Sequence, residues 1–203
     1  KTDTADRAET DQNLAEAKAA IEKAKLADKA AQAKLAEVNQ DDVISLKELE
    51  GLYVVENQAD EANSTARGLV EALPENMQAP LLDELDALNG IEIPSINDTD
   101  NNNIPDEQDA LIAEAQDLLA AVKAADQKAN EELTKAEADK AINQQEHDNL
   151  ENLQQDFTMK KQAASDKINQ IEEKYRGDLP TQLEVLKGIT VPAVNDTNSN
   201  GKP

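Results

Sequence analysis

The stretch IPSINDTDNNNIPDEQD at residues 93–109 decides how this chain is divided. It recurs as VPAVNDTNSNGKP at residues 191–203, and an offset of 98 residues aligns the two copies. The same offset aligns the rest of the sequence without a gap. Self-similarity at a fixed period is the mark of a repeat architecture, so the chain reads as two copies of one unit.

Oxygen-bearing side chains in this stretch have the spacing of a calcium loop. Calcium takes six to eight oxygen ligands, and a loop of alternating carboxylates can wrap one ion. Asn103, or Gly201 in the second copy, falls at the sharp turn and readily takes the left-handed conformation. The predicted calcium ligands are the side chains of Asp98, Asp100, Asn102, Asp106 and Asp109 and the backbone carbonyl of Ile104.

One ligand position departs from the usual calcium loop. Asp109 stands where a bidentate Glu is customary. In this respect the spacing resembles the Asp-rich loops of dockerins and thrombospondin type 3 repeats. The competing interpretation is a solvated linker of ordinary loop-forming residues that binds nothing.

The two copies set the expected domain boundaries. Each copy has about the size of a small domain with a modest core. Because the chain starts with Lys1 and ends inside a linker, we expect it to be a fragment of a longer array. The expected segments are a partial linker at 1–10, a helical repeat at 11–96, the calcium-binding linker at 97–108, a second repeat at 109–194 and a truncated linker at 195–203.

Composition narrows the classes of partner and chemistry. The net charge of -23 argues against nucleic acid and anionic lipid surfaces, which need a basic footprint. It suits a soluble, extended protein in a calcium-containing medium, or equally a halophilic protein. No apolar run approaches the roughly 20 residues that span a bilayer. With no cysteine, a single histidine (His147) and 1% aromatic residues, we expect no enzyme activity.

Apolar residues repeat at alternating spacings of three and four in the first part of each copy, which predicts a long helix with a heptad seam from residue 11 to 38. Asp28 interrupts the seam, as does Asp126 in the second copy. We expect these carboxylates to reach solvent at the seam edge; a register device or a ligand contact is the alternative. The seam residues are Leu14, Ala17, Ile21, Ala24, Ala31, Leu35 and Val38, and then Ile112, Ala115, Leu119, Val122, Ala129, Leu133 and Ala136.

Two further helices and an extended segment complete each copy. Ser45 and Asn143, each three residues before a Glu, predict capping boxes at the start of the second helix. A short third helix is expected at 80–89 and 178–187, followed by a glycine stop. The segment after it contains Pro and should run extended along its own bundle, with Ile93 and Ile96 substantially buried against both long helices. The predicted fold is all-α: two tandem elongated three-helix bundles joined by an Asp/Asn-rich linker.

Several of these features together point to a known class. They are the Ala-rich long helix, the Ile-x-x-x-Glu-x-x-Leu start of the second helix (Ile44, Glu48 and Leu52), the Leu-x-x-Leu-x-Gly ending (Leu85, Leu88 and Gly90) and the Asn-Asp-Thr linker. The chain resembles the GA-like three-helix repeats of large bacterial surface adhesins of the biofilm-associated type. That resemblance implies an extracellular, cell-surface location and a tandem extender that projects a distal ligand-binding domain.

The expected function is therefore that of a structural spacer in cell adhesion, made rigid by calcium between repeats. A free Asn-rich linker samples many orientations, and one bound ion would fix several of its residues. Its partners would be neighbouring repeats of the same chain. The alternative is a helical binding module that captures a host or matrix protein.

Overall fold

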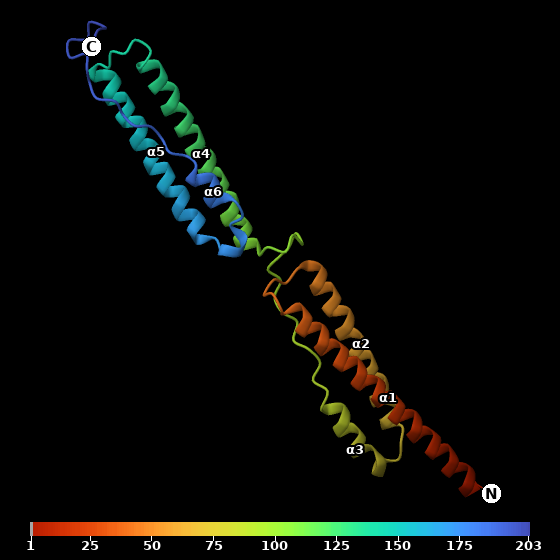
Figure 1. Ribbon diagram of the computed structural model, residues 1–203. Helices are drawn as coiled ribbons and strands as arrows, with labels where there is room; N and C mark the ends of the chain where they lie inside the picture. The colour runs from red at the N-terminus through yellow and green to blue at the C-terminus, as the bar shows by residue number, and fades with distance from the viewer. Residues whose placement is uncertain (1) are drawn as a thin grey trace. The chain divides into compact units, whose positions relative to one another are not determined.

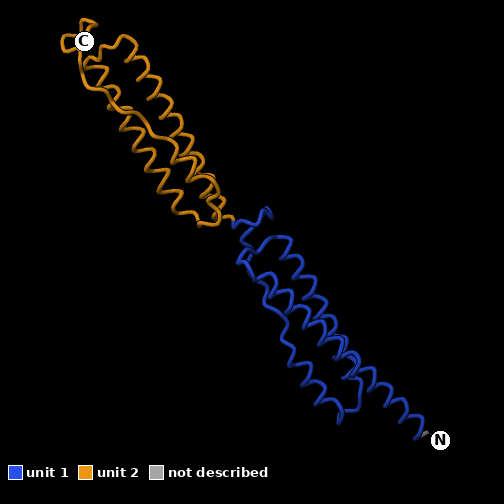
Figure 2. Tube along the Cα trace, in the orientation of Figure 1, with its two compact units in different colours: residues 1–105 blue, residues 106–203 orange. Residues whose placement is uncertain are grey.

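The computed structural model describes residues 2–203 and divides the chain into two compact units, Lys1–Pro105 and Asp106–Pro203. Figure 2 colours the two units separately. The boundary between them falls inside the expected linker at 97–108. Both units are helical, and the described residues form no strand, only an isolated parallel bridge between Ser45 and Asp98. The all-α prediction of two tandem helical units is confirmed.

Each unit contains two long helices and a short third element (Figure 1). In both units the second helix begins with the predicted capping box, Ser45 with Glu48 and Asn143 with Glu146. The helices of the first unit are α1 (Thr2–Val38), α2 (Leu46–Glu71) and α3 (Glu75–Asp86). Those of the second unit are α4 (Asp106–Ala136), α5 (Gln144–Gln170), the 3-10 turn η1 (Glu173–Tyr175) and α6 (Leu179–Glu184).

The first long helix begins earlier than expected. Residues 2–10, expected as part of a linker, belong to α1, which starts at Thr2. In the second copy α4 begins directly after Pro105, three residues before the expected start at Asp109. The first copy has Arg7 at the position of Pro105. Since Arg continues a helix and Pro interrupts one, α1 extends through this position while α4 starts just after it.

The third element differs between the units, and neither matches the predicted bounds. In the first unit α3 starts after Pro74 and contains Pro80 in its interior. In the second unit Gly177 stands at the position of Ala79 and has a φ of +53°. That left-handed residue breaks the helix. The same stretch therefore becomes the turn η1, followed by the six-residue α6.

The heptad seams form the cores as predicted. Most seam positions are almost fully buried, and the larger side chains of Leu14, Leu35, Ile112 and Leu133 are partly buried. In each unit one apolar cluster lies where the third element packs on the two long helices, and another lies toward the turn between those helices. The buried seam residues are Ala17, Ile21, Ala24, Ala31 and Val38 in α1 and Ala115, Leu119, Val122, Ala129 and Ala136 in α4.

The extended segments pack along their own units, as expected. Ile91 and Ile93 contact a buried cluster of Val38, Ile44 and Leu52. Ile93 and Ile96 are each partly buried, and neither is exposed. A single extended strand that crosses the surface of a two-helix hairpin has one side open to solvent, which accounts for the part of each side chain that remains accessible.

A polar contact ties the third element to the first helix in both units. In the first unit the Lys25 ammonium donates to the Glu84 carboxylate at 2.6 Å, and this contact, with Glu22, raises the pKa of Lys25 above its usual 10.5. In the second unit a neutral glutamine replaces the glutamate, and the Lys123 ammonium donates to the Gln182 carboxamide at 2.7 Å. Among the residues described, none of the helices has both the length and the apolar character needed to cross a bilayer.

Candidate functional site

The Asn-Asp pair of the linker is docked on the turn between the two long helices. The Asn97 carboxamide accepts the Ile44 N–H at 2.6 Å and donates to the Asp42 carbonyl at 2.8 Å. The backbone N–H groups of Asn97 and Asp98 both donate to the Ile44 carbonyl. These bonds fix the end of the extended segment to the α1–α2 turn.

The second unit repeats this docking at the same positions. Asn195 accepts the Ile142 N–H at 2.6 Å and donates to the Lys140 carbonyl at 3.0 Å. Asn195 and Asp196 also donate their N–H groups to the Ile142 carbonyl. Because two units with different surface residues keep the same contacts, we assign the Asn a structural task in each repeat. The sequence interpretation missed this task.

Asp98 organises the loop that follows. Its side chain is 0% exposed, and its two oxygens accept the N–H groups of Asn102 and Asn103 at 3.2 and 3.0 Å. Asn101 and Asn103 have φ values of +60° and +64°, which places both in the left-handed region. The turn predicted at Asn103 is therefore present, and the Asx side chain holds it.

The loop at the end of the second unit has the same internal bonds. Asp196 is 2% exposed and accepts the N–H groups of Asn200 and Gly201 at 3.1 and 2.9 Å. Ser199 and Gly201 have positive φ values of +56° and +75°. The Asp side chain therefore holds the same turn, up to the sixth residue of the loop, in both copies.

The predicted calcium ligands are divided between the two units. Asp98, Asp100, Asn102 and Ile104 end the first unit, whereas Asp106 and Asp109 lie in the first turn of α4. The structure brings Asp98, Asp100 and Asn102 together: the Asn102 N–H donates to both carboxylates, and the Asn102 carboxamide accepts the Ile104 N–H at 2.7 Å.

The donor set fits a calcium ion chemically. Six oxygens, four of them from carboxylates, meet the lower limit of calcium coordination. A carboxylate has about four lone-pair sites, so Asp98 can accept two N–H groups and retain one lone pair on each oxygen for a cation. The calcium site stays a prediction.

Asp28 and Asp126 are partly exposed at the seam edge, and each carboxylate also has a structural partner. The Asp28 carboxylate accepts the Gly90 N–H at 2.9 Å, and Asp126 accepts the Gly188 N–H at 2.8 Å. The next N–H in each unit donates to a second side chain, Glu56 or Gln154. The two long helices thus hold the chain where the third element ends, which is the register role considered as the alternative.

Asp28→Asn is expected to destabilise the first unit by about 1 kcal/mol. The amide keeps an oxygen acceptor for Gly90, but a hydrogen bond to a charged group contributes about 1.5–3 kcal/mol against about 0.5–1.5 for a neutral one. Urea denaturation monitored by circular dichroism measures the change. Asp60→Asn, an exposed residue of α2, serves as control; equal stability of the two variants would contradict the register role.

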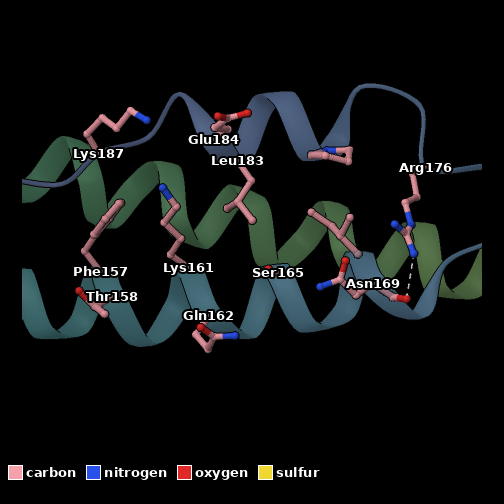
Figure 3. A pocket seen from close by; sticks show the side chains of 12 residues that line it. Phe157, Thr158, Lys161, Gln162, Ser165, Asn169, Arg176, Leu183, Glu184 and Lys187 are labelled. Atoms are coloured by element: carbon pink, nitrogen blue, oxygen red, sulfur yellow. Dashed lines mark hydrogen bonds between the residues drawn. The ribbon is translucent and has the colours of Figure 1, made fainter. Parts of the chain in front are cut away.

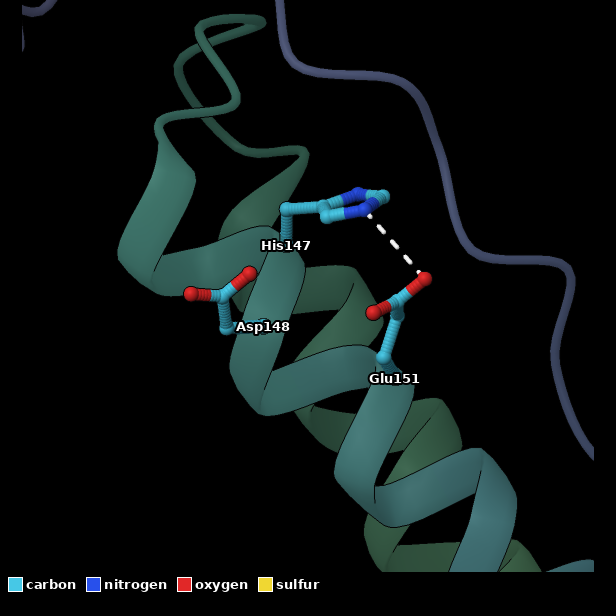
Figure 4. Close-up of side chains that lie close together, drawn as sticks. All are labelled: His147, Asp148 and Glu151. Carbon is cyan, nitrogen blue, oxygen red and sulfur yellow. Dashed lines mark ion pairs between the residues drawn. The ribbon is translucent and has the colours of Figure 1, made fainter.

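A second group of potential metal ligands lies at the start of α5 (Figure 4). His147, Asp148 and Glu151 have ligand atoms within 4.8 Å of one another. The His147 ring already has protein partners, with Nδ1 2.9 Å from the Pro192 carbonyl and Nε2 3.4 Å from Glu151. His147 is half-buried and joins α5 to the extended segment, so its role is packing and hydrogen bonding.

Comparison with known families identifies the repeat. The family model described as GA-like domain matches residues 14–107 and again residues 112–203. The chain belongs to the GA-like domain family. No curated protein and no solved structure gives a match. The resemblance to GA-like repeats is thereby confirmed, and the matched ranges place one GA-like repeat in each half of the chain.

Proposed function

We propose that the two GA-like repeats are a structural spacer in an extracellular bacterial adhesin. The proposal rests on the position at which the chain leaves each unit. Asn97 docks beside Ile44, just past the end of α1, and Asn195 docks beside Ile142, just past the end of α4. The exit is therefore one long helix away from the entry, about 55 Å for 37 residues and about 46 Å for 31.

Such a path suits a spacer because every added repeat gains length. A unit whose chain ends lay together would add mass to an array without extending it. Packing in the first unit also serves stiffness, since two buried apolar clusters join α1 to α2 and Ile91 and Ile93 of the extended segment pack against one of them. The repeat partners of each unit are the neighbouring repeats of the same chain.

We propose further that calcium stiffens the linker between repeats. Four carboxylates within twelve residues repel one another, and a divalent cation removes that repulsion while fixing the residues that bind it. The Asp98 loop already has its turn, and Asp106 and Asp109 already lie in α4, so the ion would fix only the connection between the loop and that helix. Extracellular calcium modules bind in the range of about 10⁻⁴ to 10⁻³ M, which suits a protein outside the cell.

Calorimetric titration of calcium into the chain is expected to show one site with a dissociation constant of about 10⁻⁴ to 10⁻³ M. Asp100→Asn should weaken it about tenfold, since one of four carboxylates is lost. Asp60→Asn, outside the loop, is the matched control. Small-angle scattering with calcium and with chelator should differ while helix content stays constant. Absence of heat together with identical scattering profiles would refute the calcium linker.

A helical face that captures a host or matrix protein is the second candidate function. Tyr53 and Val54 on α2 are 51% and 55% exposed, and a partner would cover such adjacent apolar side chains. Loss of capture from serum or matrix extract on Tyr53→Lys, with Lys47→Glu unaffected, would favour this function over the spacer.

A further inference from the structure

The second unit has a cleft between α5 and the η1–α6 segment (Figure 3). Its volume is about 470 Å³, within the range of about 300–1,000 Å³ typical of small-molecule sites. Phe157, Ile168 and Leu183 supply apolar walls, and Pro180 adds to them at the start of α6. Figure 3 shows α5 side chains on one side of the cleft and those of the later segment on the other.

An ion pair joins α2 to α3 at the equivalent positions of the first unit. The Arg67 guanidinium bridges from α2 to the Asp86 carboxylate of α3 at 2.6 Å. The second unit retains the acid as Glu184 but has Ser165 at the position of Arg67. With the long arginine side chain replaced by a hydroxymethyl group, Ser165 cannot make the ion pair that Arg67 makes with Asp86, and it lines the cleft instead.

The positions that line the cleft have a net positive charge in the second unit, and the equivalent positions have a net negative charge in the first unit. Three neutral side chains of the first unit are replaced by cations, so the cleft has three cationic groups and the single carboxylate of Glu184. The same positions of the first unit contain Arg67 and three carboxylates. The replacements are Asn63 by Lys161, Gln78 by Arg176 and Asn89 by Lys187, and the three carboxylates are Asp60, Glu71 and Asp86.

Two of the cations are held in place by the backbone. Arg176 donates through Nε to the Ile171 carbonyl at 2.8 Å and through a terminal nitrogen to the Asn169 carbonyl at 3.1 Å. Guanidinium has five N–H donors, so these two bonds leave others for a ligand. Lys161 donates to the Leu186 carbonyl, and its ammonium lies 5.7 Å from the centre of the Phe157 ring.

From these observations we infer that the second unit binds a small amphiphilic carboxylate in this cleft. The apolar body lies against Phe157, Leu183 and Pro180, and the carboxylate lies among the cations. The charge of the cleft selects an anion, which is notable in a chain of net charge -23. Its volume suits a small molecule, since a stable protein interface buries about 1,200–2,000 Å². The first unit has the Arg67–Asp86 ion pair and more carboxylates at the equivalent positions, so it should not bind such an anion. This inference is independent of the proposed spacer function.

Decanoate, titrated below its micelle concentration into the full 203-residue chain, tests the site. We expect saturable binding of one decanoate per chain, with amide shift changes in α5 and α6 and none at the equivalent residues of α2 and α3. Decyltrimethylammonium has the same tail with a cationic head and should not bind. Lack of saturation, or equal binding of the two amphiphiles, would overturn the inference.

Three variants separate the site from general charge effects. Ser165→Arg should pair with Glu184 as Arg67 does with Asp86, close the cleft and weaken decanoate binding by about tenfold or more. Lys187→Glu, at an exposed position, should weaken it about fivefold. Lys128→Glu on α4 makes the same charge change away from the cleft and should leave affinity unchanged. With helix content retained by all three, wild-type affinity in Ser165→Arg would contradict the assignment.

Discussion

Gly188→Ala is expected to destabilise the second unit by about 3 kcal/mol, the sum of left-handed backbone strain and overpacking. Gly188 has a φ of +68°, a conformation that L-residues adopt at a cost. A Cβ there would also lie 2.7 Å from Cδ1 of Phe157 and 2.5 Å from Oε1 of Gln154. The Phe157 ring is 3% exposed and cannot move away without disturbing the core. Urea denaturation followed by circular dichroism measures the loss.

Other glycines of the chain provide graded controls. Gly90→Ala should cost less than Gly188→Ala, because its Cβ would meet the end of the flexible Glu56 side chain and no ring. Gly177→Ala should lower the free energy of unfolding by about 1 kcal/mol, because only the positive φ of this position opposes the new side chain. Gly68 lies inside α2 with open space around it, so Gly68→Ala should raise the free energy of unfolding by about 0.5–1 kcal/mol. A Gly188→Ala variant as stable as Gly90→Ala would show that the ring contact is unimportant.

The helices could be predicted because their signals are local. The seam of α1 follows from spacings of three and four residues, and the caps at Ser45 and Asn143 follow from a residue three positions later. The third element could not be predicted in this way. Pro80 suggests a helix start but lies inside α3, and the single change from Ala79 to Gly177 divides the same stretch in the other copy. The positive φ of Gly177 therefore determines that this stretch forms η1 and α6 and not one helix like α3.

The sequence indicated the linker residues and a calcium-binding role for them, but it did not indicate that they also bond to the turn between the two long helices. Asn97 and Asp98 were identified by their repetition and by oxygen spacing. Their contacts with Ile44 join residues 53 or 54 positions apart, and no local pattern encodes such a pairing. A signal did exist, since Asn97 recurs as Asn195 although it is not one of the expected calcium ligands. The same reasoning applies to Asp28 and Asp126, whose recurrence on an apolar seam fits a bond to a turn better than solvent exposure.

Asn97→Ala is expected to destabilise the first unit by about 2 kcal/mol or more, because it removes two hydrogen bonds and leaves a buried donor unpaired. Ile44 is 6% exposed, so its N–H would find no solvent partner in place of the Asn97 oxygen. The Asp42 carbonyl would lose its donor as well. The extended segment should detach at its end first, since the apolar contacts of Ile91 and Ile93 lie farther back along the chain.

Amide hydrogen exchange distinguishes this local detachment from general instability. The Ile44 amide should exchange about 30-fold faster in Asn97→Ala, the factor that corresponds to about 2 kcal/mol. Asn13→Ala, at an exposed position of α1, should leave that rate unchanged or lower it, because Ala is the better helix former. If Ile44 stays as protected as in the wild type, the Asn97 side chain does not hold the exit of the unit. The exit beside Ile44 would then rest on the backbone bonds of Asn97 and Asp98 alone, and the linker that follows would still leave from the same turn.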